Sequence, residues 1–317
     1  MRSRAGASRV GKETTVTIAI PAHNRARIIG ETLASVAALR IPEGMLAECI
    51  VVDNNSTDDT MEVAEAFALR SPIPTRCLFE PNPGSSHARN RAIEEARGDY
   101  ILFIDDDAVA EPEWAIELIA AIERRGLDAA CGMVLPRWAI EPPRWLGPSL
   151  FIRLAVHDER KIAESSPQQL DTIHHYFSVS AGFRRRAFEL FGGFRGDLGV
   201  IGGNPMSGED TELFERIMNS GGRVGFAPRA RVRHLIPPER MRRAYLRHKA
   251  FAFGFGSAIA GGPTHNHLDK LGRNALRMAW ALMRGDVERA VYHELECANF
   301  LGYWRGRLQL NRERGDP

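Results

Sequence analysis

Three adjacent carboxylates that directly follow a short apolar run are the residues best suited to do chemistry. The run is Tyr100-Ile101-Leu102-Phe103-Ile104, and the acids are Asp105-Asp106-Asp107. A run this short, with β-branched and aromatic residues and no polar alternation, predicts a strand that is buried on both faces. Ligands of parallel α/β sheets bind just outside the carboxyl ends of the strands. The three acids would therefore stand at a ligand-binding edge.

Packing does not account for three neighbouring acids, because like charges this close repel and raise one another's pKa. A hard divalent cation would relieve the repulsion, and Mn²⁺ or Mg²⁺ prefers oxygen ligands that are often shared with substrate phosphates. The alternative is a solvated acidic loop that caps the next helix, since Glu111-Pro112-Glu113 follows. This stretch alone leaves both interpretations open.

Two further predicted strands end in polar residues. Val16 to Ile20 is stopped by the turn Pro21-Ala22-His23-Asn24, which contains no glycine, so the dinucleotide fingerprint G-x-G-x-x-G is absent. Glu48 to Val52 ends at Asp53, and Ser56 to Asp59 reads as a capping box for a helix to about Arg70. Asp53 would either hydrogen-bond a base or ribose or form an Asx turn.

Cations gather at the start of another predicted helix, which runs from His87 to Arg97 after a strand over Thr75 to Phe79. His87, Arg89 and Arg91 oppose the helix macrodipole there, which makes sense if an anion docks at this end. The alternative is an exposed face that carries surface charges. Gly98 is expected to close this helix as a left-handed cap.

A second acidic pair, Glu209-Asp210, opens a helix that is expected to reach about Asn219. The glycine-rich stretch from Leu198 to Gly208 leads into it and is expected to be flexible. Ser207 and Asp210 alone would also make a capping box. The pair is thus a candidate for catalysis or for helix capping.

These residues need a scaffold, and the order of elements predicts one. Four strand–helix repeats end with a strand over Ala129 to Leu135, which indicates a right-handed, mostly parallel α/β sheet. A long loop is expected over 136–175, then strands over 176–182, 223–227 and 230–234 with a short helix over 184–191. Amphipathic helices over 268–284 and 286–308 would pack on the core or lie on a membrane or a lipid-linked acceptor.

Composition limits the classes of partner. Lys and Arg number 42 against 40 Asp and Glu in 317 residues, so bulk charge favours no nucleic acid. The four cysteines lie far apart and are expected to be reduced thiols of a cytoplasmic protein. The basic start lacks a secretory h-region, and no apolar run approaches the ~20 residues of a transmembrane helix. We expect a cytoplasmic protein, with a peripheral position at the inner face of the membrane as an extension of that expectation.

In order and spacing, these motifs together resemble the family-2 glycosyltransferases with their GT-A fold, over Val16 to His234. The residues that carry the resemblance are Ile20-Pro21-Ala22-His23-Asn24, Val51-Val52-Asp53-Asn54-Asn55-Ser56-Thr57-Asp58, Ala88-Arg89-Asn90, Gly98-Asp99-Tyr100, Asp105-Asp106-Asp107, Gly192-Gly193-Phe194, Gly208-Glu209-Asp210-Thr211-Glu212-Leu213 and Val232-Arg233-His234. Two departures are His23 within the first turn and Arg91, where many relatives carry a small residue.

The resemblance implies an α/β, Rossmann-like mixed sheet, mainly parallel, that is flanked by helices and followed by a C-terminal helical extension. It implies a disordered basic N-terminus over 1–14, a catalytic domain over 15–236 and the extension over 237–317. Within the catalytic domain, 15–135 would bind the nucleotide-sugar and 136–236 the acceptor.

The resemblance also implies roles for single residues. Asp210 would be the catalytic base, with Glu209 beside it, and Asp107 would be the direct metal ligand, with Asp105 and His234 as further ligands of Mn²⁺ or Mg²⁺. The donor would contact Pro21, Ala22, His23, Asn24, Asp53, Arg89, Asn90, Asp105 and Asp106.

The implied reaction moves a sugar with inversion from a nucleoside-diphosphate donor, UDP being the expected carrier, to a hydroxyl of a glycan, a lipid-linked acceptor or a protein. A nucleotidyltransferase is the first competing hypothesis, but its glycine-rich phosphate loop after the first strand is missing. A non-catalytic binding module is the second, and the intact acid motifs argue against it.

Overall fold

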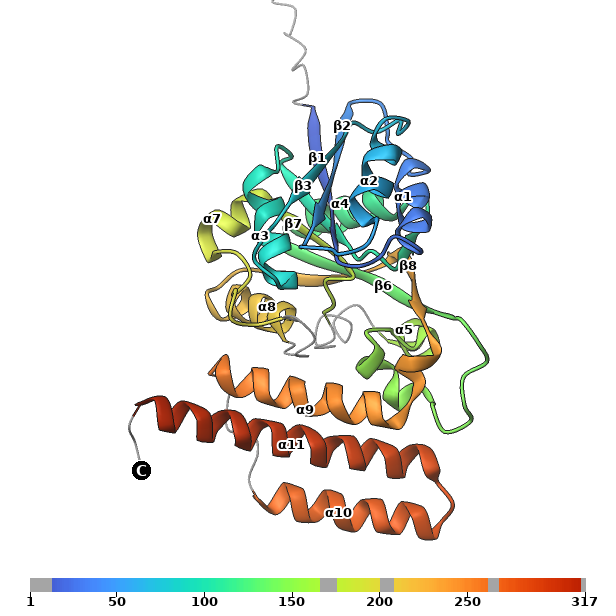
Figure 1. Cartoon of the computed structure of the whole chain (residues 1–317), viewed down its shortest axis with the longest axis vertical. Coiled ribbons are helices and arrows are strands. Elements are labelled where there is room, and N and C mark those ends of the chain that lie inside the picture. Colours follow the sequence, from blue (N-terminus) through green and yellow to red (C-terminus); the bar gives the residue numbers. More distant parts are fainter. Residues whose placement is uncertain (1–12, 166–175, 200–207, 262–267, 315–317) are drawn as a thin grey trace, which may run out of the picture.

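The computed structural model describes residues 13–165, 176–199, 208–261 and 268–314, and within these ranges eight strands form one sheet (Figure 1). The strand order is β3-β2-β1-β4-β7-β6-β8-β5. The strands are β1 Thr14–Ala22, β2 Met45–Asp53, β3 Thr75–Phe79, β4 Tyr100–Ile104, β5 Ala108–Ala110, β6 Ala129–Trp138, β7 Ser180–Arg184 and β8 Val224–Ile236. The helices of the sheet region are α1 Ile29–Ala37, α2 Thr60–Ala68, α3 Ser85–Glu95, α4 Trp114–Arg125, η1 Pro148–Leu154, α5 Glu159–Glu164, α7 Arg185–Phe191 and α8 Glu209–Asn219.

The sheet is mixed, as predicted, with parallel pairs among β1 to β4 and a further parallel pair between β6 and β8. β1 pairs in parallel with both β2 and β4, and β2 pairs in parallel with β3. β7 runs antiparallel to β4 and β6, and β5 runs antiparallel to β8. The chain leaves β1 toward β2 and β3 and then returns to its other side as β4. This reversal between β1 and β4 is the point at which open α/β sheets bind ligands.

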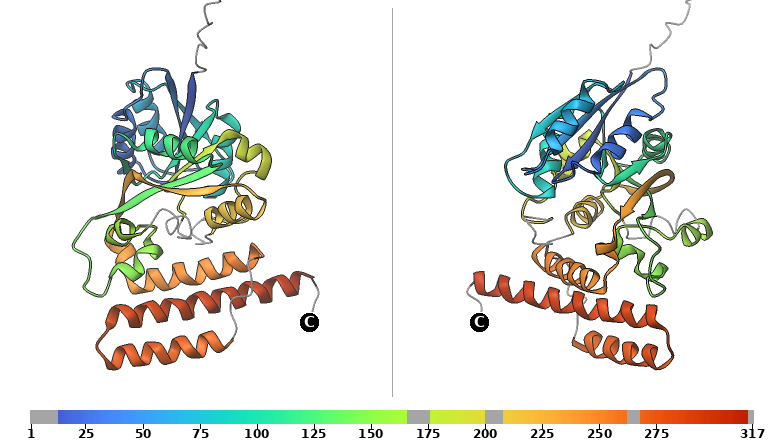
Figure 2. Two further views of the ribbon diagram at one scale, coloured as in Figure 1. Left: turned by 180° about the vertical axis from the view of Figure 1, so that it is seen from behind. Right: turned by 45° about the vertical axis from the view of Figure 1, so that its right-hand side comes forward.

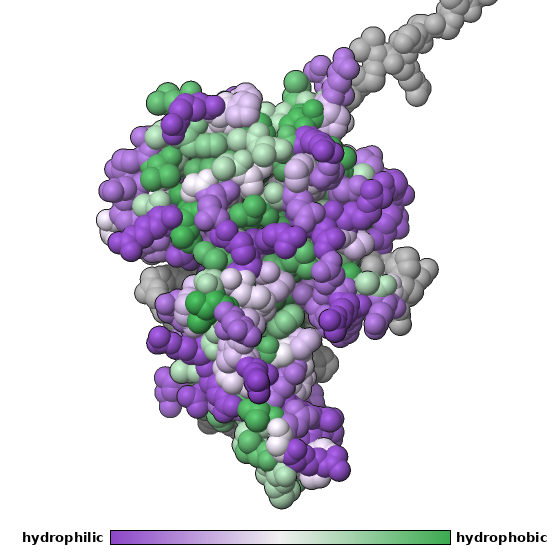
Figure 3. Space-filling model, turned by 90° about the vertical axis from the view of Figure 1, so that its right-hand side faces the viewer, coloured by the Kyte–Doolittle hydropathy of each residue, from purple (hydrophilic) through white to green (hydrophobic). Residues whose placement is uncertain are grey.

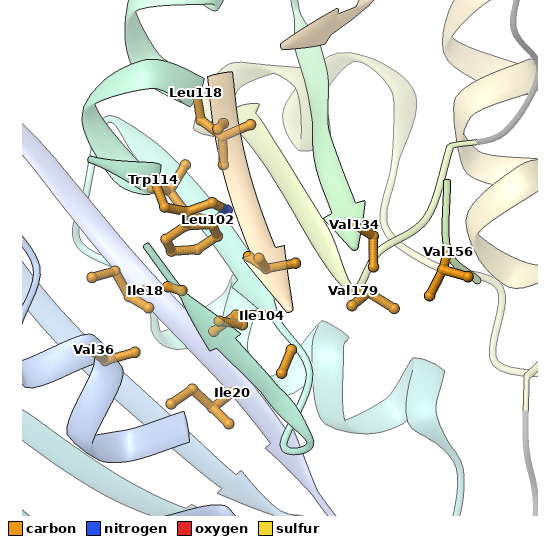
Figure 4. Close-up of a cluster of buried hydrophobic side chains, with 14 of the residues drawn as sticks. Ile18, Ile20, Val36, Leu102, Ile104, Trp114, Leu118, Val134, Val156 and Val179 are labelled. Carbon is orange, nitrogen blue, oxygen red and sulfur yellow. The ribbon is translucent and has the colours of Figure 1, made fainter. Parts of the chain in front are cut away.

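β4 is buried on both faces and separates two apolar clusters. Leu102 and Ile104 face one cluster with Trp114 of α4, which Figure 4 shows between the sheet and the helix. Phe103 faces the other cluster, where its ring meets Phe183 edge-on at 6.0 Å between centroids. The fully buried strand predicted for Tyr100 to Ile104 is confirmed, and its burial fixes the position of the three acids that follow.

Gly98 is not the helix cap that we expected. α3 ends at Glu95, Ala96 is extended, and Gly98 has no left-handed backbone. Instead, Gly98 lies in close backbone contact with β1, and its N–H donates to Thr17 Oγ1 at 2.9 Å. A Cβ at Gly98 would stand 2.4 Å from the Thr17 backbone nitrogen. The small residue is needed because the chain enters β4 pressed against β1.

Gly98→Ala is therefore expected to lower the free energy of unfolding by about 1–3 kcal/mol, the usual cost of overpacking, because rigid backbone must shift. Gly30→Ala is the matched control. Gly30 is an exposed residue of α1, and a Cβ at this position would meet nothing within 4 Å. This control should be neutral or stabilise by up to about 1 kcal/mol. Urea unfolding of both variants measures the difference, and equal stabilities would contradict this account of Gly98.

The capping box predicted at Ser56 to Asp59 is also wrong. α2 begins at Thr60, and Ser56 Oγ accepts from the Asn24 backbone N–H at 2.9 Å. The Asn24 side chain in turn accepts from the Thr57 N–H at 2.8 Å. These polar side chains tie the turn after β1 to the turn after β2 instead of capping a helix. Tertiary hydrogen bonds have taken precedence over the local pattern.

The second half of the sheet differs from expectation in its boundaries. The expected strands over 223–227 and 230–234 are one strand, β8, whose register against β6 slips between Gly132 and Met133. β7 begins at Ser180 rather than at 176. The expected loop over 136–175 contains the end of β6, η1 and α5, and its residues 166–175 lie outside the described ranges. The predicted boundary at 135/136 falls inside β6, and the division into halves stays a prediction.

Beyond β8 the chain forms a stack of helices under the sheet region (Figures 1 and 2). After the short turn η2 Pro238–Met241 come α9 Arg243–Ile259, α10 Leu268–Met283 and α11 Val287–Arg314. α9 faces the sheet region, α11 lies against α9, and α10 is the outermost layer. No described helix is both long and apolar enough to cross a bilayer.

Glycines bring α9 and α11 into backbone contact. A Cβ at Gly254 of α9 would lie 1.9 Å from the Asn299 carbonyl oxygen, and one at Gly302 of α11 would lie 1.9 Å from that of Phe251. The glycines that interrupt the apolar run after Phe251 are therefore packing positions. The four cysteines are all free thiols.

Candidate active site

The turn after β1 is fastened to the middle acid of the triple-Asp motif. The His23 backbone N–H donates to Asp106 Oδ2 at 3.3 Å, and Arg25 Nε donates to Asp106 Oδ1 at 3.0 Å. Burial, followed by the neighbouring Asp107, raises the pKa of Asp106 to about 7 against the opposing charge of Arg25. Both oxygens of Asp106 thus face the protein. Pro21 and Ala22 end β1, and Asn24 takes a left-handed backbone at φ 53°.

The first acid, Asp105, is joined to the helix of the second acidic pair through one buried arginine. Arg89 of α3 donates from Nη2 to Asp105 Oδ1 and from Nη1 to Glu209 Oε1, each at 3.0 Å. Glu209 Oε2 also accepts from the Gly208 N–H at 3.1 Å. The expected anion at the start of α3 is therefore a pair of carboxylates of this same chain. Asn90 holds the Phe194 backbone through two hydrogen bonds of 2.7 and 2.8 Å.

The last acid, Asp107, lies in a buried cluster with His234 of β8 and Arg240 of η2. Asp107 Oδ1 is 3.2 Å from His234 Nε2, and Asp107 Oδ2 accepts from Arg240 Nη2 at 2.9 Å. Burial by itself raises the pKa of Asp107, but the His234 ring and the Arg240 guanidinium overcome it and hold that pKa well below its usual range. Its two basic neighbours therefore favour the ionised form of Asp107.

The atoms of this cluster fit a divalent cation, although no group of three His, Cys, Asp or Glu side chains is arranged as a metal site within the described ranges. His234 Nε2 faces both Asp107 Oδ1 and Arg240 Nη1, the latter at 2.9 Å. One nitrogen cannot donate to a carboxylate and accept from a guanidinium at once. A cation ligated by Asp107 and His234 would replace the contact between these two side chains, because two ligands at ~2.1 Å from one ion lie about 3 Å apart. Arg240 would then have to release His234 Nε2, whose single lone pair would bind the ion.

Asp210 has a different environment from its neighbour Glu209. Its Oδ1 accepts from the Thr211 N–H at 2.8 Å and its Oδ2 from the Ser178 N–H at 3.4 Å. Among the described residues, no ion pair to Asp210 forms. Burial and then the adjacent Glu209 raise the pKa of Asp210 to about 6, against the charge of Arg89. A carboxylate whose pKa lies near neutral pH, and which forms no ion pair among the described residues, is suited to accept a proton.

Asp53, at the end of β2, partly fulfils the Asx-turn alternative. Its Oδ2 accepts from the Ser56 N–H at 3.3 Å, while its Oδ1 is buried and has no hydrogen-bond partner among the residues that the structure describes. An orphaned buried acceptor costs free energy unless a ligand satisfies it. Asp53 therefore keeps one carboxylate oxygen available to accept a hydrogen bond from a ligand.

Two arginines at the site were missed by sequence reasoning. Arg25 follows the first turn directly, and Arg240 belongs to the basic segment that begins after Pro237-Pro238. Only the pairing of β5 with β8 brings His234 opposite Ala108, and hence η2 beside Asp107. The signal available in the sequence was Arg240, six residues after His234, with Pro237-Pro238 between them.

The strand order, the acid cluster at the β1/β4 reversal and the second acidic pair on α8 define a GT-A-type fold. A model of the family described as glycosyl transferase family 2 matches residues 17–191, and the chain belongs to that family. The resemblance seen in the motifs is thereby confirmed, and the protein is a nucleotide-sugar glycosyltransferase.

Known relatives and solved structures agree with this class. The succinoglycan biosynthesis protein ExoM of Rhizobium meliloti is 28% identical over 253 residues, which are 80% of this chain and 74% of that protein. A glucosyl-dolichyl phosphate glucuronosyltransferase of Haloferax volcanii is 27% identical over 249 residues, 78% of this chain and 77% of that protein.

The solved structures are more distant in sequence and support the fold. Mannosyltransferase PcManGT from Pyrobaculum calidifontis, in complex with GDP-Man and Mn²⁺, has a TM-score of 0.58 at 21% identity and covers 95% of this chain and 76% of its own. Residues 1–349 of S. aureus TarS, in complex with UDP-GlcNAc, have a TM-score of 0.53 at 16% identity and cover 96% of this chain and 93% of their own.

Proposed function

We propose that this glycosyltransferase is metal-dependent and inverting, and that it transfers a sugar from a nucleoside-diphosphate donor, UDP-linked in the first instance, to an acceptor hydroxyl. The observation that carries the proposal is the contrast between the two acidic groups. Asp107 is a carboxylate beside His234 and Arg240 whose pKa is held well below its usual range, whereas Asp210 has a pKa raised to about 6 and no ion pair among the described residues. One group is suited to a cation and the other to a proton.

The residues of the chain then have distinct tasks. Asp107 and His234, with Asp105 on the same loop, would hold Mn²⁺ or Mg²⁺, whose charge would stabilise the departing diphosphate. Asp53 offers its free Oδ1 to the base or ribose. Asp210 takes the proton from the acceptor hydroxyl as its oxygen attacks the anomeric carbon. Attack opposite the leaving group inverts the configuration, through a transition state that resembles an oxocarbenium ion.

Arg89 and Asp106 act by positioning. Arg89 joins Asp105 to Glu209 and so fixes the metal-binding loop relative to the start of α8, where Asp210 lies. Asp106 fixes the His23 turn, the other part of the predicted donor site, against the same loop. Donor groups, cation ligands and base are thereby held on one framework before substrates bind, which lowers the entropic part of the barrier.

The donor and the metal are tested together by thermal unfolding with UDP, GDP, dTDP or NAD, each with and without Mn²⁺. A ligand at about 100 times its Kd adds roughly 2.7 kcal/mol to the free energy of unfolding. We expect stabilisation by one nucleoside diphosphate and only when Mn²⁺ is present. Stabilisation by NAD without metal, or by none of the four, would contradict the proposal.

The pH dependence of transfer is expected to follow Asp210. A base with a pKa of about 6 is protonated below that pH, so kcat/KM should fall roughly tenfold per unit as the pH drops below about 6 and level off above it. Initial rates between about pH 5 and pH 8 measure this fall of kcat/KM at low pH. The residual rate of Asp210→Asn should not show this fall below about pH 6. An unchanged fall in that variant would assign the titration to another group.

The acceptor and the cellular place follow from the relatives by analogy. One relative is described as a succinoglycan biosynthesis protein, and another as a glucosyl-dolichyl phosphate glucuronosyltransferase. We therefore extend the proposal to a glycan or lipid-linked acceptor in polysaccharide or glycoconjugate biosynthesis, at the cytoplasmic face of the membrane. Transfer of a radiolabelled sugar into the lipid-extractable fraction, compared with the polymer fraction, distinguishes these acceptors.

A further inference from the structure

The outermost helix, α10, carries exposed apolar side chains that its packing does not explain. α10 lies against α11 on the side away from the sheet region, as both views in Figure 2 show. Leu276 and Met283 are 73% and 78% exposed, and Leu282 and Trp280 are 55% and 46% exposed. Green, hydrophobic atoms are visible on the lower tip of the molecule in Figure 3, where α10 turns into α11.

The apolar face of α10 is rotated away from its packing face. Ala281 is buried, and Asn274 meets His293 Nδ1 of α11 at 2.9 Å, so a polar residue lies in the contact between the two helices. At 100° per residue, Leu276 and Met283 project within about 20° of each other and far from Asn274. A helix that served only to complete the core would turn these residues inward.

Arginines border this apolar face. Arg273, Arg277 and Arg284 are exposed, and the sequence from Lys270 to Arg284 contains no Asp or Glu. The Arg284 guanidinium lies 4.2 Å from the centre of the Trp280 ring, which is the arrangement of a cation above an aromatic plane. An exposed apolar stripe with Trp and Leu beside a row of arginines is the pattern of a helix that lies in the surface of a bilayer.

We propose that this α10 face, made of Leu276, Trp280, Leu282, Met283 and the arginines Arg273, Arg277 and Arg284, docks on the surface of an anionic lipid bilayer. Charge favours this occupant over a second copy of the chain. A two-fold dimer through α10 would place the same arginines of both copies in one interface, where like charges repel. Anionic head groups instead complement the arginines while the apolar side chains enter the acyl boundary.

The test is co-sedimentation of the full chain with vesicles of phosphatidylcholine alone and with added phosphatidylglycerol. We expect binding to the anionic vesicles, weak binding to the neutral ones, and loss of binding as salt screens the charges. The triple change Arg273→Gln, Arg277→Gln and Arg284→Gln should lower the partition constant by on the order of 10²-fold. Leu276→Glu with Met283→Glu should abolish binding.

Leu69→Glu is the matched control, since Leu69 is 89% exposed but lies at the end of α2. It should bind vesicles like the unchanged protein. Equal binding to neutral and anionic vesicles, or full binding by Leu276→Glu with Met283→Glu, would overturn the proposal. If sedimentation velocity shows a dimer of the unchanged protein and only monomer for Leu276→Glu with Met283→Glu, the face would be assigned to a second copy instead. None of these readouts uses a sugar donor or an acceptor, so failure here would leave the proposed transfer reaction and its residues untouched and would bear only on the place at the membrane.

Discussion

Asp210→Asn is expected to lower the transfer rate by on the order of 10²-fold or more, while the protein still binds its nucleoside diphosphate. The amide has nearly the shape of the carboxylate, and its single oxygen can keep the 2.8 Å hydrogen bond from the Thr211 N–H, but its NH2 group cannot accept from the Ser178 N–H and the side chain cannot take a proton. Donor binding should persist because the contacts that we propose for the cation and the nucleobase lie at Asp107, His234 and Asp53. Single-turnover transfer and nucleotide titrations separate the two effects.

Relative to the unchanged protein, the same variant should gain stability as the pH rises. The pKa of Asp210 is raised from 3.8 to about 6 in the folded protein, so the carboxyl favours folding fully below about pH 4 and loses that contribution as the pH rises through 6. Asparagine does not ionise. The stability gained by Asp210→Asn should therefore grow between about pH 4 and pH 6 and stay constant above it.

Glu209→Gln is the matched control for this prediction. Glu209 accepts a hydrogen bond from the buried Arg89, so its neutralisation leaves that cation with less compensation and should lower stability at neutral pH. Opposite stability changes in two adjacent carboxylates would separate a base from a positioning residue. Unchanged transfer in Asp210→Asn would remove Asp210 from the mechanism.

Asp107→Asn is expected to remove the effect of Mn²⁺ on nucleotide binding and to lower transfer by on the order of 10²-fold or more, because the developing charge of the diphosphate loses its stabilisation. The change deletes the anion that both His234 and Arg240 contact. Electron paramagnetic resonance of free Mn²⁺ measures the binding directly, without any donor or turnover.

Arg240→Gln provides the comparison. Its guanidinium occupies Asp107 Oδ2 and faces His234 Nε2, so it competes for the atoms that would ligate the cation. Without it, Mn²⁺ should bind several-fold more tightly to the free protein, since Asp107 keeps its full charge. Weaker Mn²⁺ binding in Arg240→Gln, or unchanged binding in Asp107→Asn, would place the cation elsewhere.

Sequence reasoning predicted most of the sheet because each strand of its first half is a short apolar run that ends in polar residues. The burial of Tyr100 to Ile104 followed from its composition, and the mainly parallel order followed from the alternation of strands and helices along the chain. Capping and boundaries failed where distant parts of the chain supplied the partners. Gly98 fits against β1, and Ser56 bonds to Asn24, so neither follows the local rule that its neighbours suggested.

The site was predictable in its residue types but not in its pairings. The sequence showed the two groups of acids, but nothing in it indicated that Arg89 would join Asp105 to Glu209, which lies 120 residues beyond Arg89. Arg240 reaches Asp107 only because β8 lies beside β5. Long-range ion pairs depend on topology, and periodicity carries no information about them.

The stack of α9, α11 and α10 would act as a spacer between the bilayer and the sheet. Gly208, next to Glu209, lies close to Phe253 of α9, so the acidic edge faces the first layer of the stack. Helix axes in contact lie about 8–10 Å apart, and a helix with its side chains has a radius of about 5–6 Å, so the two intervals plus the radii of the outer helices give a height of roughly 30 Å. Backbone contact at Gly254 and Gly302 makes the first interval rigid. With α10 on the lipid, a hydroxyl must extend about that far above the membrane to be glycosylated. The stack would thus select acceptors by length, and the first sugars next to a lipid carrier would lie out of reach.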